Sequence, residues 1–347
     1  MFPWIIFITV ITLILGYWKL GKNNLKIRFI LGSIIAIIFS IIRYDVGYDY
    51  FQYYNKILNN TYDYELISSK IAFLGYYFRY PPLAISLFGL ISYILIFNTI
   101  YKFSINPIFS LFIFICLLYL PFLTTIRQAL AVSISFYSFR FILKKQLLYT
   151  IIFTIIAIFV HSSAIFTLFI YIIYNYIKPK YTIYILLGAV ILYPLIFIAF
   201  AEIGFYARIA SKFQDADITE LGDGGGGNKI KWFYFILCVI TIITVRIKKI
   251  KINNNLLSIL IFGCIFPFLL GAHYGQRVGQ YFNIYYLFVI PIIIKPFNKL
   301  IKFSTTFIFS LYFIILLNSG SSQYRKPYVP YKTLYELYDV NNPKFRN

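Results

Sequence analysis

Four short pieces of the sequence place arginine, histidine and aspartate beside apolar stretches long enough to enter a membrane. They are Arg43-Tyr44-Asp45-Val46-Gly47-Tyr48-Asp49-Tyr50, Arg127-Gln128, His161-Ser162-Ser163-Ala164 and Arg277-Val278-Gly279-Gln280-Tyr281. Guanidinium groups are always charged and bind phosphate oxygens with two parallel donors. Histidine and aspartate suit proton transfer in catalysis. The pattern therefore indicates a substrate that carries several phosphate oxygens.

Arg127 and Gln128 open one apolar stretch, and His161 ends the next one. A helix N-terminus adds free backbone N–H groups and a positive dipole end to Arg127, which favours an anion site. Arg127 and His161 lie at nearly equal sequence distances from Lys144-Lys145, so in a helical hairpin both side chains reach the same depth. One bound group could then contact both. The alternative is that His161 is a core residue and that the serines after it cap a helix.

The first piece allows two interpretations. Arg43, Asp45 and Asp49 either form a local ion cluster that ends a helix, or supply a carboxylate that acts as a base or a metal ligand. Gly47 between the two acids allows a sharp turn or a close approach to a ligand. Among the acids, Asp49 is the first catalytic candidate and Asp45 the second.

The elements that position these residues are membrane-spanning helices. With 61% hydrophobic and 12% charged residues, the chain is predicted to be an all-α polytopic membrane protein that forms a single transmembrane domain over residues 1–347. We expect about twelve spans, near residues 2–18, 27–42, 82–100, 107–123, 128–143, 147–160, 164–177, 181–200, 231–245, 256–271, 278–294 and 303–318.

Charge divides the loops between these spans into two sets. In alternate loops the charged residues are all Lys or Arg, and these loops are assigned to the cytoplasm. All 11 acidic residues and both histidines fall on the other side. Both termini are then extracytoplasmic, in a multi-pass protein of the plasma membrane. The net charge of +21 follows from this loop bias and does not indicate nucleic acid. The three cysteines lie in apolar spans without ligand spacing, so neither a metal nor another cofactor is expected.

The outer side has three sizeable segments, residues 43–81, 201–231 and 318–347. In the last one, Tyr331, Leu334, Tyr335 and Tyr338 recur with helical spacing after Pro330, which predicts an amphipathic helix. Such a helix either lies in the membrane interface or stacks sugar rings on its tyrosines.

The ordered set of motifs resembles the EpsG/Wzy-type polysaccharide polymerases, which are bacterial integral membrane glycosyltransferases. The matching pieces run from the second span to the C-terminus: Arg43-x-x-x-Gly47-x-Asp49-Tyr50-x-x-Tyr53, Arg127-Gln128-x-x-Ala131, His161-Ser162-Ser163-Ala164, Arg277-x-x-x-Tyr281 and Pro330-Tyr331-Lys332. The resemblance implies a class C glycosyltransferase-like fold with its active face outside. It also implies a substrate, oligosaccharide repeat units on undecaprenyl pyrophosphate, and makes a flippase and a chain-length regulator of the same pathway candidate partners, besides membrane lipid.

On this resemblance Arg43, Arg127, Gln128 and Arg277 bind pyrophosphate, and either His161 or Asp49 deprotonates the attacking hydroxyl. The candidates for glycan contact are Tyr50, Tyr53, His273, Tyr281 and Tyr331. Two other functions stay open. A ligase that moves finished glycan to another acceptor would use the same residues, and a flippase or exporter of the lipid-linked glycan would need polar groups through the whole membrane depth.

Overall fold

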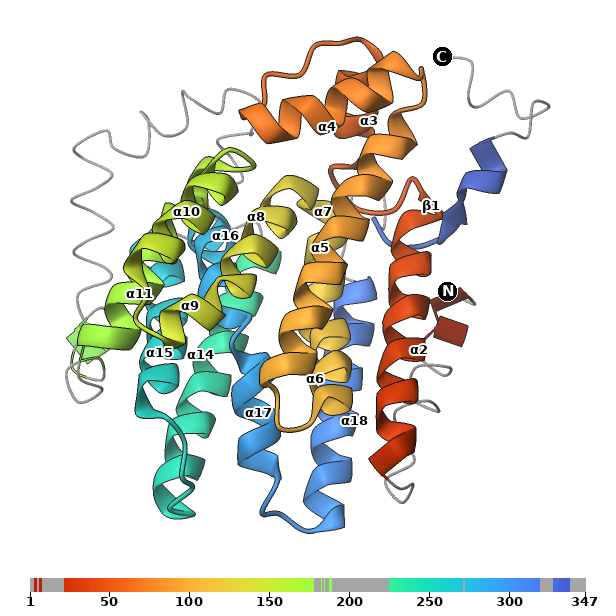
Figure 1. Cartoon of the computed structure of the whole chain (residues 1–347). Coiled ribbons are helices and arrows are strands. Elements are labelled where there is room, and N and C mark those ends of the chain that lie inside the picture. The colour runs from red at the N-terminus through yellow and green to blue at the C-terminus, as the bar shows by residue number, and fades with distance from the viewer. Residues whose placement is uncertain are drawn as a thin grey trace. The chain divides into compact units, whose positions relative to one another are not determined.

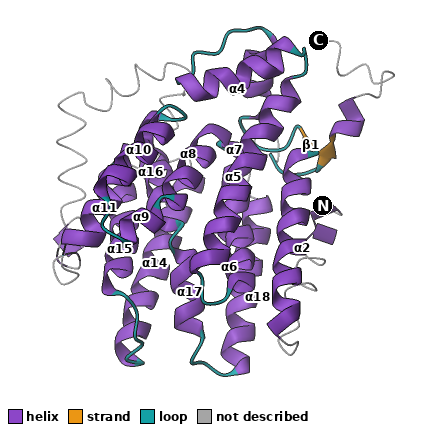
Figure 2. Cartoon of the chain, in the orientation of Figure 1, coloured by secondary structure: helices purple, strands orange, loops and turns teal. Residues whose placement is uncertain are grey.

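The structure, a computed structural model, describes residues 22–177, 225–270, 272–318 and 327–337, with isolated positions within 3–7 and 182–188. In this part the chain is mostly helical, and Figure 2 shows β1 (Arg43–Tyr44) as a short strand among helices. The chain divides into two compact units, and the single transmembrane domain stays a prediction. Unit 1 is Met1–Ser138, Ile152–Ile165 and Phe297–Asn347, and unit 2 is Phe139–Ile151 and Phe166–Pro296.

Four helical stretches within the described residues are long and apolar enough to cross a bilayer, and a bent pair of helices makes a fifth candidate. The four are α5 (Pro81–Phe103), the run of α6 (Pro107–Phe114), η1 (Ile115–Tyr119) and α7 (Leu120–Thr124), α14 (Gly225–Ile247) and α18 (Lys299–Asn318). The bent pair is α16 (Ala272–Asn283) with α17 (Tyr286–Ile294), at 53°. The prediction of an all-α membrane protein is therefore confirmed in its class.

The expected spans 2–18 and 181–200 lie almost wholly outside the described residues, and the other expected spans coincide with helices. Several of these helices are shorter than a span or carry charges, so the count of twelve stays a prediction. They are α2 (Lys22–Ile41), α8 (Ile126–Tyr137), α9 (Phe139–Leu143), α10 (Leu147–Ile158), α11 (Phe166–Tyr176) and α15 (Asn254–Leu269).

In unit 1, α5 packs against α2 and α8, while α3 (Tyr50–Leu58) and α4 (Leu66–Tyr77) lie over the end of α5 where Pro81 starts it (Figure 1). The buried face of α4 consists of the small residues Ser68, Ala72 and Gly75. Small side chains let helix backbones approach closely. The α3–α4 segment is thereby held against the N-terminal end of α5.

In unit 2, α15 and α16 pack with almost no space between their backbones. A Cβ added at Gly275 would lie 2.3 Å from Cα of Pro267, and one at Gly279 would lie 3.1 Å from the carbonyl oxygen of Gly263. Gly275 and Gly279 are separated by one helical turn and share a face, as in the small-residue helix interfaces of membrane proteins. This packing fixes the helix that carries Arg277.

The C-terminal segment of unit 1 joins the loop that follows α2. Strand β1 pairs antiparallel with β2 (Lys332–Thr333), so that Arg43 faces Thr333 and Tyr44 faces Lys332. The Leu334 N–H donates to the Ile42 carbonyl at 2.8 Å, continuing this attachment beyond β2.

The amphipathic helix predicted from Tyr331 onward is replaced by β2 and one turn of 3-10 helix, η4 (Leu334–Leu337). Tyr331 is buried, its ring stacks on Phe39 at 4.0 Å, and its hydroxyl donates to the Phe39 carbonyl. Tyr338 lies outside the described residues. Contacts with the first loop thus override the helical spacing, which reports only local preference.

A buried ion pair strengthens this attachment. The Asp45 carboxylate, which is 5% exposed, accepts a bond of 3.1 Å from the Lys332 ammonium. Asp45 itself has φ 57°, so its backbone turns back toward β2. The carboxylate therefore holds the tail on the loop that carries Asp49.

Replacing Lys332 by Met should destabilise unit 1 strongly, because it leaves the buried Asp45 carboxylate without its cation. Breaking such a pair from one side costs about 3–5 kcal/mol, whereas removing both charges costs less. We expect thermal unfolding in detergent, followed by tryptophan fluorescence, to occur at lower temperature in Lys332→Met and to recover in part in Asp45→Asn/Lys332→Met. Equal unfolding temperatures in the single and double variants would contradict this coupling.

Gly47→Ala should also destabilise the protein, because Gly47 has φ 109° and an added Cβ would lie 2.8 Å from the Leu123 carbonyl oxygen. Its N–H donates to the Pro327 carbonyl at 2.7 Å, so the loop cannot move away without losing the tail. The expected loss is roughly 1–3 kcal/mol. Gly188→Ala is the matched control, since nothing lies within 4 Å of its added Cβ. The same thermal assay should separate the two, and similar shifts in both would argue against a special requirement at Gly47.

Candidate functional site

Arg127 lies in the first turn of α8, just after Thr125 leaves helical geometry with φ −96° and ψ 63°. Its Nη1 donates to Glu65 Oε2 at 2.8 Å, and the two side chains are 20% and 25% exposed. The guanidinium carbon lies 4.0 Å from the centre of the Tyr64 ring and 5.9 Å from that of Tyr53. The cation is thus held by one carboxylate and two aromatic rings, which attract it through their electron-rich faces.

Glu65 also contacts the turn that carries His161. Its second oxygen, Oε1, accepts the backbone N–H of Ser162 at 2.9 Å. Nearby, the Ile67 N–H donates to the Phe159 carbonyl at 2.8 Å, and Ser68 Oγ donates to the Val160 carbonyl at 2.7 Å. The start of α4 is therefore bonded to the end of α10. The sequence analysis missed Glu65, whose only signal was its position directly before an apolar run.

His161 follows the C-terminus of α10 and is half-buried. Its Nδ1 accepts the backbone N–H of Ser163 at 3.3 Å and lies 2.8 Å from Ser163 Oγ. A backbone donor requires a lone pair on Nδ1, so a neutral ring in this arrangement carries its proton on Nε2. The Nε2 position then offers a hydrogen-bond donor. This geometry suits binding of an oxygen anion better than removal of a proton.

Asp49 precedes α3 and is half-buried. Burial raises the pKa of Tyr64, and the neighbouring charges of Tyr53 and Asp49 raise it further, while Arg127 lowers it. Asp49 also contributes to the raised pKa of Tyr328, of which burial is the main cause. The charges of both Asp49 and Arg127 therefore act on Tyr64, in opposite directions.

Arg43 and Asp45 are placed differently from the sequence expectation. The Arg43 guanidinium is 2% exposed and donates through Nη1 to the carbonyls of Val46, at 3.0 Å, and Leu123. Carbonyl groups in the last turn of α7 have no backbone N–H partner within the helix, and the Arg43 guanidinium donates to one of them. Asp45 is engaged by Lys332. Neither is presented to a substrate here, and within the described ranges no three His, Cys, Asp or Glu side chains gather as metal ligands.

Several predicted contact residues are also covered by the protein. Gln128 and Tyr50 are each 2% exposed, Tyr331 is 6% exposed and Tyr281 is fully buried. Burial of these rings leaves little face for stacking a sugar. Tyr53 is likewise buried, but it lies beside Arg127.

Arg277 and His273 lie on α16 in unit 2. Arg277 is half-buried, in the same helical turn as Gly275 and Gly279, which face α15. Nothing is described of the His273 side chain. Arg43, Asp45, Asp49, Arg127 and His161, by contrast, all belong to unit 1.

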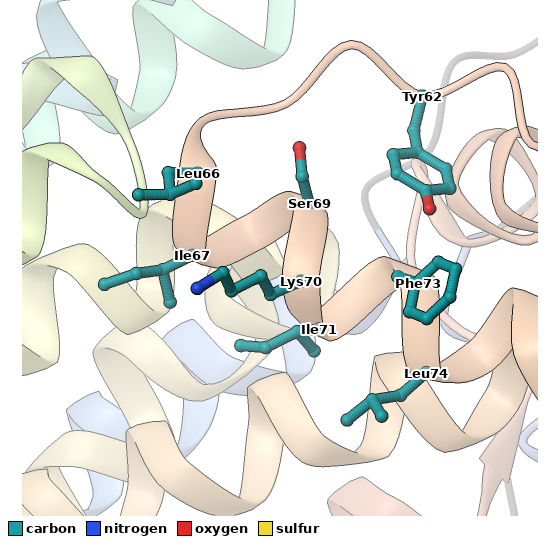
Figure 3. Close-up of a pocket in the computed structure, with 8 residues that line it drawn as sticks. All are labelled: Tyr62, Leu66, Ile67, Ser69, Lys70, Ile71, Phe73 and Leu74. Atoms are coloured by element: carbon teal, nitrogen blue, oxygen red, sulfur yellow. The ribbon is translucent and has the colours of Figure 1, made fainter.

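A shallow pocket of about 600 Å³ follows α4 directly after Glu65 (Figure 3). Its lining is mainly apolar, with Lys70 as the one cation among the lining residues Tyr62, Leu66, Ile67, Ser69, Lys70, Ile71, Phe73 and Leu74. In Figure 3, Leu66, Ile67 and Ile71 project to the same side of the helix as Lys70. Apolar side chains and the Lys70 ammonium thus lie next to each other along one short helix.

Comparison with known proteins identifies the family. The model of the EpsG family matches residues 25–333, which includes every motif described above. Neither the search of curated proteins nor that of solved structures found a match. The matched range covers most of the chain, and it confirms the resemblance drawn from the ordered motifs. The chain therefore belongs to the EpsG family.

Proposed function

We propose that this membrane protein lengthens polysaccharide by joining oligosaccharide repeat units carried on undecaprenyl pyrophosphate, at the outer face of the bacterial plasma membrane. Membership of the EpsG family makes it a polysaccharide polymerase-like membrane protein. The observation that carries the finer proposal is the cluster of Arg127, Glu65 and the His161 turn at the end of unit 1. It combines an anion-binding fork with a neighbouring hydrogen-bond donor and a carboxylate.

The proposed reaction transfers the growing glycan from its lipid pyrophosphate to a hydroxyl of a new lipid-linked unit. The bond between the anomeric carbon and the phosphate oxygen breaks, a bond from that carbon to the hydroxyl oxygen forms, and the hydroxyl proton leaves. Arg127 offsets the negative charge that develops on the departing pyrophosphate. Asp49 is assigned to accept the proton, because it is half-buried, whereas both carboxylate oxygens of Glu65 are engaged by Arg127 and Ser162.

His161 is assigned a different part in this proposal. With Nδ1 occupied by Ser163, its Nε2–H donates to a phosphate oxygen. The sequence motif Arg277-x-x-x-Tyr281 assigns phosphate binding to Arg277 as well.

A lipid-linked substrate also accounts for the surroundings of the site. The mainly apolar pocket is lined mostly by residues of α4 (Figure 3). Since α4 begins at the residue after Glu65, which binds Arg127, we propose that the pocket holds a hydrocarbon chain whose phosphate end reaches Arg127. Anchoring both substrates in the membrane raises their effective concentration, which replaces a tight pocket for a free sugar donor.

The orientation rests on charge. The loops around Glu65, Thr125 and Ser162 alternate along the chain with loops that contain only Lys and Arg, and the basic loops favour the cytoplasm. Twelve spans with both termini outside are the topology that we propose on this pattern.

Arg127→Ala should abolish long glycan while leaving the protein in the membrane, because the leaving pyrophosphate loses its cation. The purified chain is incubated with a lipid-linked repeat unit, and the products are resolved by mass and by length. We expect lipid-linked dimers and longer products from the wild type and a rate at least about 100-fold lower for Arg127→Ala. Arg277→Ala should behave similarly.

The control for both variants is Arg79→Ala, which removes an exposed arginine of segment 43–81 and should keep the wild-type distribution of product lengths. Transfer by the wild type to a different acceptor would replace the polymerase assignment with a ligase. Absence of any covalent change would favour transport. An unchanged distribution of product lengths in Arg127→Ala would show that this residue does not take part in the mechanism.

His161→Gln should retain far more activity than His161→Ala, because the glutamine amide can still donate near the Nε2 position. Loss of one such donor costs about 10²–10³ in rate, so we expect that loss in the alanine variant and a loss within about tenfold in the glutamine variant. Asp49→Asn should lose at least about 10² as a missing base. Initial rates with the lipid-linked unit test this. Equal losses in both His161 variants, with an active Asp49→Asn, would return the base role to His161.

A further inference from the structure

Glu65 joins two parts of the candidate site that have no sequence relation to it. Its Oε2 binds the Arg127 guanidinium at 2.8 Å and its Oε1 accepts the Ser162 N–H at 2.9 Å. Arg127 opens α8, and Ser162 follows directly on His161. Both oxygens of one carboxylate are therefore used to connect the anion-binding fork to the turn that carries the second donor.

We propose that Glu65 is a positioning residue of the polymerase reaction, which aims the Arg127 guanidinium and fixes the His161 turn while it competes with the substrate phosphate for Arg127. This inference rests on the function proposed above. Glu65 then has opposite effects on the turnover rate and on the affinity for lipid pyrophosphate. The carboxylate speeds turnover by orienting the donors, and it weakens binding of lipid pyrophosphate by offering Arg127 a competing anion.

An ordinary surface ion pair does not account for this arrangement. Exposed pairs hold two flexible side chains in water and contribute little. Here the guanidinium is stacked at 4.0 Å on Tyr64, the residue before Glu65, and the carboxylate accepts a backbone donor as well. Charge-assisted bonds with fixed partners are the stronger kind. The pair is thus held in one geometry from both sides.

The backbone around Glu65 is itself fixed, so the side chain cannot drift with its loop. Ser69 Oγ donates to the Tyr64 carbonyl at 2.7 Å, and the Ile67 N–H donates to the Phe159 carbonyl at 2.8 Å. Since these bonds set the position of the Glu65 backbone, the length of its side chain decides whether both donors are reached. Aspartate, shorter by about 1.5 Å, would reach only one of them.

Glutamine at position 65 removes the charge and keeps the shape. It has one acceptor oxygen and one NH₂ donor, so it can satisfy Arg127 or Ser162 but not both. The Arg127 guanidinium then no longer has a competing anion, and it is also less firmly oriented. The matched control is Asp63→Asn, which removes a carboxylate two positions away on an exposed residue of the same segment.

The test measures binding and turnover separately on the full-length protein in detergent. Binding uses polyprenyl pyrophosphate without sugar, followed by calorimetry, and turnover uses initial rates with the lipid-linked repeat unit. For Glu65→Gln we expect Kd to fall about 3–10-fold and kcat to fall about 10–100-fold, with Asp63→Asn within twofold of wild type in both. Should the glutamine variant not fold, Glu65→Ala must give the same pair of changes.

A purely structural role for Glu65 would weaken binding and lower the unfolding temperature together, and this result would overturn the proposal, as would an unchanged kcat. In addition, the loss in Glu65→Gln/Arg127→Ala should be smaller than the product of the two single losses, because part of the effect of Glu65 acts through that arginine; fully multiplicative losses would contradict it. If the wild type binds polyprenyl pyrophosphate but joins no repeat units, the proposed function fails, while the change in Kd still decides whether Glu65 competes for Arg127.

Discussion

A chain that crosses a bilayer must satisfy its own backbone N–H and C=O groups, and this requirement decides where irregular backbone can lie. In the described part of unit 1, two helix ends are satisfied by segments distant in sequence. Arg43 donates to the Leu123 carbonyl where α7 ends, and Glu65 accepts the Ser162 N–H after α10 ends. These loops are therefore bonded to one another, and the candidate site lies among these bonds.

The same constraint gives Arg43 and Arg127, the arginines of two sequence motifs, different roles. Arg43 is 2% exposed and bonded to neutral carbonyls, so it could reach a ligand only by opening the loop that it holds. Arg127 is 20% exposed and bonded to a carboxylate on another segment. An anion can replace a carboxylate on an accessible guanidinium without disturbing the helix behind it. Accessibility and exchangeable partner together make Arg127 the better candidate for binding phosphate.

Local patterns predicted the helices and the order of the motifs, because apolar runs and Pro or charged ends act over a few residues. They also predicted that Arg127 and His161 reach the same depth, and Glu65 now gives these two segments a shared partner. Long-range contacts were beyond such patterns. Asp45 and Lys332 are 287 positions apart, and nothing in either neighbourhood specifies the other.

The burial of the tyrosines could not be predicted from local sequence patterns either. The chain has 34 tyrosines, so their presence near a motif carries little information, and Tyr50, Tyr281 and Tyr331 turned out to be covered. The predicted tail helix failed for the same reason, since Tyr331 packs on Phe39 and Lys332 pairs with Asp45. The spacing of side chains reports a preference for helix, but partners distant in sequence decide whether that preference is used.

The arrangement around Arg127 also bears on the product of the proposed reaction. Each cycle of glycan transfer leaves a lipid pyrophosphate that must depart before the next unit binds. A guanidinium whose charge is offset by Glu65 holds an anion less tightly than an unopposed cation would. Binding that is equally strong before and during the reaction slows release without speeding chemistry. A carboxylate inside an anion site, which looks unfavourable for affinity, is therefore consistent with an enzyme that must repeat its reaction on one growing chain.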